Sequence, residues 1–106
     1  MGIITVNKDN FDKEVLSAEK PVLADFFTTW CGDCKRIAVA LDMIAEKKSE
    51  EIISVKIDCD AQPELKKRYD IMAYPTLYVF KNGKPGKALV EPFSKAEIDE
   101  WLNSEL

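Results

Sequence analysis

The sequence contains no histidine and only three cysteines among its 106 residues. A structural zinc site needs four nitrogen or sulfur ligands, and an iron–sulfur cluster usually needs four thiolates. The chain cannot supply either set by itself, so we expect no metal site. An odd number of cysteines also argues against the disulfide-stapled framework of small secreted proteins. These counts favour a catalytic pair of cysteines over a structural pair.

Long apolar runs and blocks of like charge are missing as well. No run approaches the roughly 20 residues of a membrane-spanning helix. Fifteen basic and nineteen acidic residues give a formal charge of -4 that is spread along the chain, without the basic block that nucleic acid or an anionic membrane would require. The first residues match neither a secretory signal nor a myristoylation signal. We therefore expect a soluble cytoplasmic protein, with one domain over residues 1–106 and a monomer as the default state.

Two of the cysteines, Cys31 and Cys34, stand three positions apart in the segment WCGDCK. They lie close together if the chain turns into a helix between them, so they can exchange between a dithiol and a small-ring disulfide. The segment 21–27 before them is nearly all apolar, which is typical of a central strand covered on both faces. Helical spacing after them places Cys31 at a helix N-terminus, where a thiolate is best stabilised. We expect Cys31 to be the more exposed thiol and the attacking one.

Strands and helices alternate along the chain. Strands are predicted at residues 2–6, 21–28, 51–58, 76–80 and 87–90. Helices are predicted from Asn7 to before Lys20, over residues 31–48, from Pro63 to Tyr69, and after a capping box formed by Ser94 and Glu97. The turn at residues 81–84 predicts a hairpin between the last two strands. The fold class is therefore α/β, with a central five-stranded mixed sheet and helices on both faces.

An acidic residue, Asp25, interrupts the apolar strand at residues 21–28. Desolvation disfavours the charged form and can raise the pKa of a buried carboxyl by up to ~3–5 units. Such an acid can accept a proton at neutral pH. The alternative is an ordinary carboxylate at the strand end that meets solvent.

Further motifs follow in a fixed order along the chain: Asp25-Phe26, Trp30-Cys31-Gly32-x-Cys34-Lys35, Lys56-x-x-x-Asp60, Tyr69-x-Ile71-x-x-x-Pro75-Thr76 and Phe80-Lys81-Asn82-Gly83. In this order and spacing they resemble the thioredoxin family over essentially the full chain. The resemblance implies the thioredoxin fold and a redox-active pair that reduces disulfides in other proteins. It also implies a thioredoxin reductase as the partner that recharges the pair, and no bound cofactor beyond the Cys31–Cys34 disulfide itself.

The resemblance assigns roles to the residues around the thiols. Cys34 would act as the resolving thiol, which attacks the mixed disulfide formed by Cys31 and releases the reduced substrate. Asp25 would accept the proton of Cys34. Lys56 would lie near this acid and moderate its pKa, although an ordinary surface lysine is the alternative reading.

The substrate-binding residues also follow from the resemblance. A cis peptide bond before Pro75 would set the backbone of Tyr74 against Cys31, where it offers a strand-like edge to an extended substrate segment. Trp30 would add apolar contact to this docking surface. Gly32 would leave the thiol accessible.

Two positions depart from the usual thioredoxin pattern. Asp33 stands where proline is commonest, and a carboxylate beside Cys31 should destabilise its thiolate, which argues for a reductant. Glu91 stands where a glycine usually lets the substrate approach. Together with Tyr74 it should make the groove bulkier and more acidic, which suggests a narrower set of clients or a dedicated reductase.

Other functions remain open at this point. The first is an oxidase or isomerase, which the missing signal sequence and Asp33 disfavour. A glutathione-dependent, glutaredoxin-like enzyme matches the sequence around Cys31 and Pro75 less well. A binding module would use the fold as a rigid subunit and leave the thiols incidental.

Overall fold

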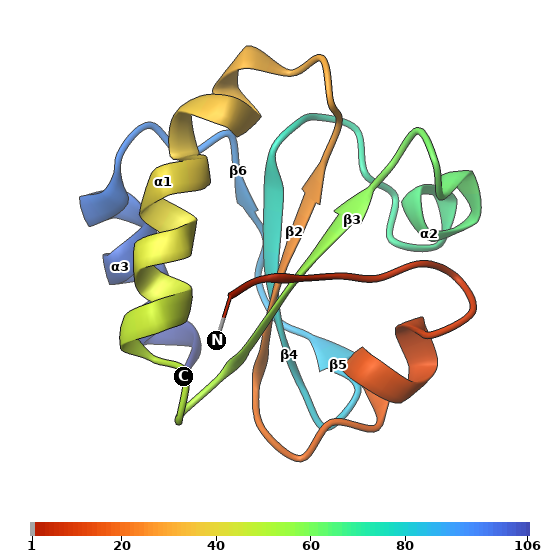
Figure 1. The fold of residues 1–106 in the computed structure, drawn as a ribbon, viewed down its shortest axis with the longest axis horizontal. Helices are drawn as coiled ribbons and strands as arrows, with labels where there is room; N and C mark the ends of the chain where they lie inside the picture. Colours follow the sequence, from red (N-terminus) through yellow and green to blue (C-terminus); the bar gives the residue numbers. More distant parts are fainter. Residues whose placement is uncertain (1) are drawn as a thin grey trace.

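The computed structural model describes residues 2–106, which form a mixed sheet between two layers of helices (Figure 1). The strands are β1 (Ile4–Thr5), β2 (Val22–Phe27), β3 (Ile53–Asp58), β4 (Thr76–Lys81), β5 (Lys84–Pro85) and β6 (Leu89–Val90). The helices are α1 (Gly32–Lys47), α2 (Pro63–Arg68) and α3 (Lys95–Glu105), with a short π-type helix η1 (Asp12–Leu16) near the N-terminus. Met1 lies outside the described residues, and the single domain expected over residues 1–106 stays a prediction.

The strand order is β1-β3-β2-β4-β5, and β6 also pairs with β4. β1 and β2 both run parallel to β3, as the alternation of strands and helices predicts. β4 is antiparallel to β2, and β5 and β6 pair antiparallel with opposite ends of β4. The α/β class and the mixed sheet are thus confirmed, and β2 lies at the centre.

The strand predicted at residues 87–90 is the main error in the sequence-based fold, because the sheet has six strands within the described residues instead of five. The Lys87 N–H donates to the Glu105 side chain at 2.9 Å, and the Lys87 carbonyl accepts from the Trp101 indole at 2.9 Å. Both backbone groups of Lys87 are therefore bound to α3 instead of to β4. The predicted strand is therefore shortened to β6, and β5, which ends at Pro85, is an additional strand before the predicted range.

Helices cover both faces of the sheet, as expected (Figure 1). On one face, side chains of α1 and α3 pack against the sheet; this core contains Leu23, Ile37, Leu41, Ile44, Leu77, Val79, Ile98 and Leu102. On the other face, η1 and α2 contribute to a core with Phe11, Val15, Val22, Ala24, Phe26, Leu65 and Phe80. Successive side chains of a strand point to opposite faces, so Asp25 shares the α1 face with Leu23.

The first predicted elements are shorter than expected. The Asn7 side chain accepts hydrogen bonds from the N–H groups of Asp9 and Asn10 at 2.8 and 3.0 Å. These bonds close a turn instead of starting a helix, so regular helical structure begins only at η1. The predicted strand over residues 2–6 is reduced to β1.

The predicted capping box of α3 is only half formed. The Ser94 hydroxyl accepts the Glu97 N–H at 3.2 Å, as the pattern requires. The Glu97 carboxylate, however, accepts the N–H of Phe93 at 2.8 Å instead of that of Ser94. This contact ties the segment between β6 and α3 to the helix. No helix within residues 2–106 has the length and apolar character needed to span a bilayer.

Candidate active site

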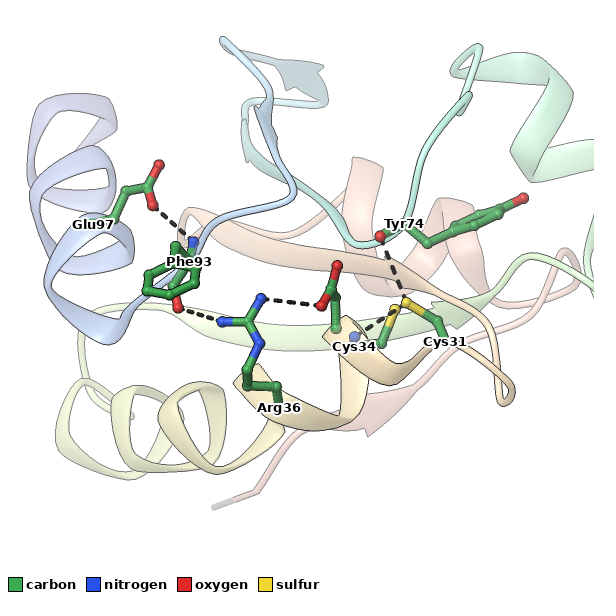
Figure 2. Close-up of polar contacts among 7 residues, drawn as sticks. Cys31, Cys34, Arg36, Tyr74, Phe93 and Glu97 are labelled. Carbon is green, nitrogen blue, oxygen red and sulfur yellow. Dashed lines mark hydrogen bonds and ion pairs between the residues drawn. The ribbon is translucent and has the colours of Figure 1, made fainter.

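The two motif cysteines lie at the start of α1, shortly after the end of β2. Cys31 is the N-cap of α1, and its sulfur accepts the N–H of Cys34 at 3.1 Å (Figure 2). A sulfur that accepts a first-turn N–H at the positive end of a helix is placed to carry negative charge. Both thiols are free in this structure, so the structure describes the reduced form.

The expected difference in exposure between the two thiols is not seen, because Cys31 is 7% and Cys34 is 6% exposed. Their surroundings differ instead. Burial raises the pKa of Cys34 to about 12, and the hydrogen bond with the Cys31 side chain adds to the rise. The Cys31 thiol donates to the Tyr74 carbonyl at 3.5 Å. Cys34 is therefore a neutral thiol in the resting dithiol.

The carboxyl of Asp25 lies on the α1 face of the sheet, where it lines the same cavity as Cys34. Parallel pairing of β2 and β3 sets Lys56 directly beside it. Burial raises the pKa of Asp25 from 3.8 to about 7, and the positive charge of Lys56 opposes the rise. Within residues 2–106 the Asp25 Oδ1 has no hydrogen-bond partner. The predicted buried acid is present, and it can take up a proton near neutral pH.

A cavity of about 250 Å³ connects Asp25 to Cys34. Its lining residues are Asp25, Phe27, Thr28, Thr29, Cys34, Lys35, Ala38 and Lys56. The Lys56 Nζ also lies 5.7 Å from the centre of the Phe27 ring. The arrangement places Lys56 in the wall of the site, which favours the moderating role over that of an ordinary surface lysine. An acid, a thiol and a cation thus share one small volume.

The loop before β4 faces the attacking thiol. The Tyr74–Pro75 peptide bond is cis, as the resemblance implies. The Pro75 carbonyl accepts the N–H of Glu91 at 2.8 Å, which brings the end of β6 beside this loop. Glu91 has a φ of 50°, in the left-handed region that favours glycine. This backbone conformation accounts for the glycine that is usual at this position.

Trp30 lies beside Tyr74. Its ring is edge-to-face with that of Tyr74, with 5.8 Å between centroids, and its indole N–H donates to Asp60 at 2.6 Å. The residue is nevertheless 66% exposed and so available for contact. A Cβ added at Gly32 would meet nothing within 4 Å. The space beside Gly32 is therefore open, and its role in keeping the thiol accessible stays a prediction.

The environment of Asp33 differs from the one that the sequence suggested. Its carboxylate forms an ion pair with the Arg36 guanidinium at 3.2 Å, and the same guanidinium donates to the Phe93 carbonyl (Figure 2). The negative charge of Asp33 is thus largely matched by Arg36. Sequence reasoning did not identify Arg36 and Phe93, and it named Asp60 only as part of a motif, without its hydrogen bond to Trp30. The spacing of Asp33 and Arg36 at i and i+3 was the only available signal for this pair.

Comparisons with known proteins agree with the site. The Thioredoxin family model matches residues 2–104. A thioredoxin of Mycobacterium bovis is 40% identical over 95 residues, which cover 90% of this chain and 82% of the relative. A thioredoxin of Acidithiobacillus ferridurans is 39% identical over 105 residues, covering 99% and 97% of the two chains. A bifunctional thioredoxin reductase/thioredoxin of Mycobacterium leprae is 38% identical over 95 residues, covering 90% of this chain and 21% of the relative.

The family match extends over nearly the whole chain, and the relatives named thioredoxin are matched over most of their length. The two cysteines that the site brings together are the groups that dithiol–disulfide exchange requires. The chain therefore belongs to the thioredoxin family of thiol–disulfide oxidoreductases.

Proposed function

We propose that this protein reduces disulfide bonds in other proteins, with Cys31 as the attacking thiolate. The observation that carries the proposal is the Cys31–Cys34 pair at the N-terminus of α1, in which Cys34 lines a cavity that it shares with Asp25. In the first step the Cys31 sulfur attacks one sulfur of the client disulfide. The client disulfide breaks, its second sulfur leaves as a thiolate, and Cys31 becomes part of a mixed disulfide.

In the second step Cys34 loses its proton to Asp25 and attacks the Cys31 sulfur. The mixed disulfide breaks, and the client leaves with both of its cysteines reduced. The Cys31–Cys34 pair has given two electrons to the client and is now a disulfide. The pKa of Cys34 is raised first by burial and then by its contacts with the Cys31 side chain. The mixed disulfide removes these contacts, because the Cys31 sulfur is then neutral and bonded. The transfer to Asp25, whose pKa is about 7, becomes easier at the moment when it is needed.

A thioredoxin reductase is the proposed electron donor. One relative's name joins the two activities, bifunctional thioredoxin reductase/thioredoxin, which supports a reductase partner for this chain. The cysteine pair carries the electrons itself, so the proposal needs no bound cofactor. We further propose a cytoplasmic monomer that binds neither nucleic acid nor membrane, supported by the acidic net charge of -4 and the lack of a basic block.

Substrate selection is proposed to follow from the groove around Cys31. The Tyr74 carbonyl offers a backbone edge, and Trp30 offers apolar area beside it. Gly32 and Asp33 form the first turn of α1 on this face, and Glu91 adds an acidic side chain next to Pro75. We expect this bulkier, acidic groove to restrict the set of clients.

Covalent trapping tests the proposed roles. The Cys34→Ser variant should accumulate disulfide-linked clients, because the mixed disulfide can no longer be resolved. The variant with both Cys31 and Cys34 changed to Ser is the matched control and should trap none. Equal capture by both variants would instead favour a binding module in which the thiols take no part in binding.

The reduction potential of the Cys31–Cys34 pair tests the direction of electron flow. A value well below the cytosolic glutathione poise of roughly −220 to −260 mV supports a reductant. A value near or above that poise would favour an oxidase or isomerase and would contradict the proposal.

A further inference from the structure

Phe93, in the segment between β6 and α3, is an exposed aromatic residue that is held from several sides. It is 79% exposed. Its N–H donates to the Glu97 carboxylate at 2.8 Å, and its carbonyl accepts from the Arg36 guanidinium. The guanidinium carbon also lies 4.9 Å from the centre of the Phe93 ring. Both backbone groups and one side of the ring are therefore engaged, while most of the side chain faces solvent (Figure 2).

The contacts of Phe93 lead back to the active site in both directions. Arg36 is held at 3.2 Å by Asp33, which stands between the two cysteines of the motif. In the other direction, Phe93 follows Glu91, whose N–H is bonded to the Pro75 carbonyl. Figure 2 shows Phe93 and Tyr74 on opposite sides of the two cysteines. Phe93 thus lies beside the first turn of α1, on the side of the two cysteines away from Tyr74.

An exposed apolar ring that is held in one position can serve as a contact for a binding partner. A side chain that is ordered before binding loses less conformational entropy when a partner arrives. Exposed aromatic rings fixed in this way are typical anchors of protein recognition. Arg36 is already paired with Asp33, so we expect no ion pair between Arg36 and a carboxylate of the client. The contact that remains to be made is apolar.

We propose that Phe93 is a specificity-determining residue that contacts a large apolar side chain next to the reactive cysteine of the client. Arg36, which is paired with Asp33, holds Phe93 in place for this contact. The occupant is an extended segment of a disulfide-containing protein, bound along the Tyr74 backbone edge. This inference rests on the proposed function, since it concerns the clients of the same thiol pair. Arg36 acts only through Phe93 and is a positioning residue.

The test uses short peptides whose single cysteine is joined to pyridinethiol by a disulfide. Attack by Cys31 on the peptide sulfur releases pyridinethione, which is followed by absorbance. One peptide has leucine on both sides of the cysteine, and the other has serine. The measured quantity is the ratio of the two second-order rate constants. We expect a ratio of about tenfold for the reduced wild-type protein, the size expected from partial burial of one leucine side chain.

The Phe93→Ala variant should lower this ratio towards one, and Phe93→Leu should restore most of it. Arg36→Gln should lower the ratio by roughly threefold, and should have no further effect when combined with Phe93→Ala. Met43→Ala is the matched control, because Met43 is an exposed apolar residue of α1 away from the groove, and it should keep the wild-type ratio. Thermal unfolding of each variant shows whether a change in rate reflects a loss of folding.

A ratio that is unchanged in Phe93→Ala would overturn the inference, as would an Arg36→Gln effect that persists without the ring. Either result leaves the proposed function intact, because the peptides are still reduced. If the wild-type protein releases pyridinethione from neither peptide nor from dipyridyl disulfide, the proposed function itself fails.

Discussion

Asp25 provides the sharpest test, because its carboxyl couples stability to pH. Burial raises its pKa from 3.8 to about 7 in the folded chain, and the unfolded chain returns it to the lower value. Between these two pH values the folded protein holds a proton that the unfolded chain has released. Stability therefore falls as pH rises through this window and is constant above it. Each pKa unit corresponds to ~1.4 kcal/mol, so the full loss is at most ~4 kcal/mol.

The Asp25→Asn variant removes this titration. Its free energy of unfolding should match that of the wild type near pH 4 and exceed it by up to ~4 kcal/mol above pH 7. The value is an upper limit, because the buried amide also needs hydrogen-bond partners. A gain of this size is large for a small domain, whose total stability is typically about 5–15 kcal/mol.

Urea unfolding of the fully reduced protein, followed by tryptophan fluorescence from about pH 4 to about pH 8, measures the difference. The matched control is Asp42→Asn, which makes the same chemical change at an exposed position of α1. This control should run parallel to the wild type at every pH. If Asp25→Asn also runs parallel to the wild type, the carboxyl ionises normally in the folded state and the reasoning is refuted.

Four further substitutions, at three positions, test the surroundings of the site. Lys56→Gln removes the charge that opposes the raised pKa of Asp25, so the pH window of falling stability should extend upwards; an unchanged window would show that the two groups do not interact. Gly32→Ala should fold normally, since the added Cβ meets nothing within 4 Å, yet slow the reduction of protein disulfides more than that of dipyridyl disulfide; equal slowing would contradict a docking role. Glu91→Gly should relieve a φ of 50° and raise stability by about 1 kcal/mol, measured by urea unfolding. Glu91→Gln keeps the backbone, and if it leaves the rates of both acidic and basic peptide disulfides unchanged, the charge does not select clients.

The sequence predicted the cysteine pair and α1 well because the signals are local. The predicted helix over residues 31–48 differs from α1 by one residue at each end. These two extra residues are its caps, Cys31 and Lys48. The apolar spacing of 3.6 residues and the nearly continuous apolar strand before it are both readable without tertiary contacts. The position of Cys31 at the helix terminus follows from them directly.

The errors arose where distant groups decide the local structure. The strand predicted at residues 87–90 is shortened to β6 because Lys87 bonds to Trp101 and Glu105 of α3, which no local pattern reveals. The equal exposure of the two thiols has the same origin. The argument from position in the helix did not include the Tyr74 loop, which covers Cys31 from a part of the chain 43 residues away.

Asp33 shows how a partner that the sequence analysis did not identify, Arg36, changes a chemical conclusion. Sequence reasoning treated its carboxylate as an unpaired charge beside the Cys31 sulfur and inferred a reductant from it. The ion pair with Arg36 weakens that argument. The structure supplies a different one, because an oxidising pair requires a strongly stabilised reduced form. Here the Cys31 sulfur accepts the Cys34 backbone N–H, the Cys31 thiol donates to the Tyr74 carbonyl, and the two cysteine side chains are hydrogen-bonded to each other; ordinary bonds of this kind contribute about 0.5–1.5 kcal/mol each. Cys34 stays a neutral, buried thiol above Asp25, whose burial also disfavours charge. These contacts are not strong enough to make the reduced form unusually stable, so we expect a reducing potential on grounds that do not depend on the charge of Asp33, and the potential measurement described above tests this expectation.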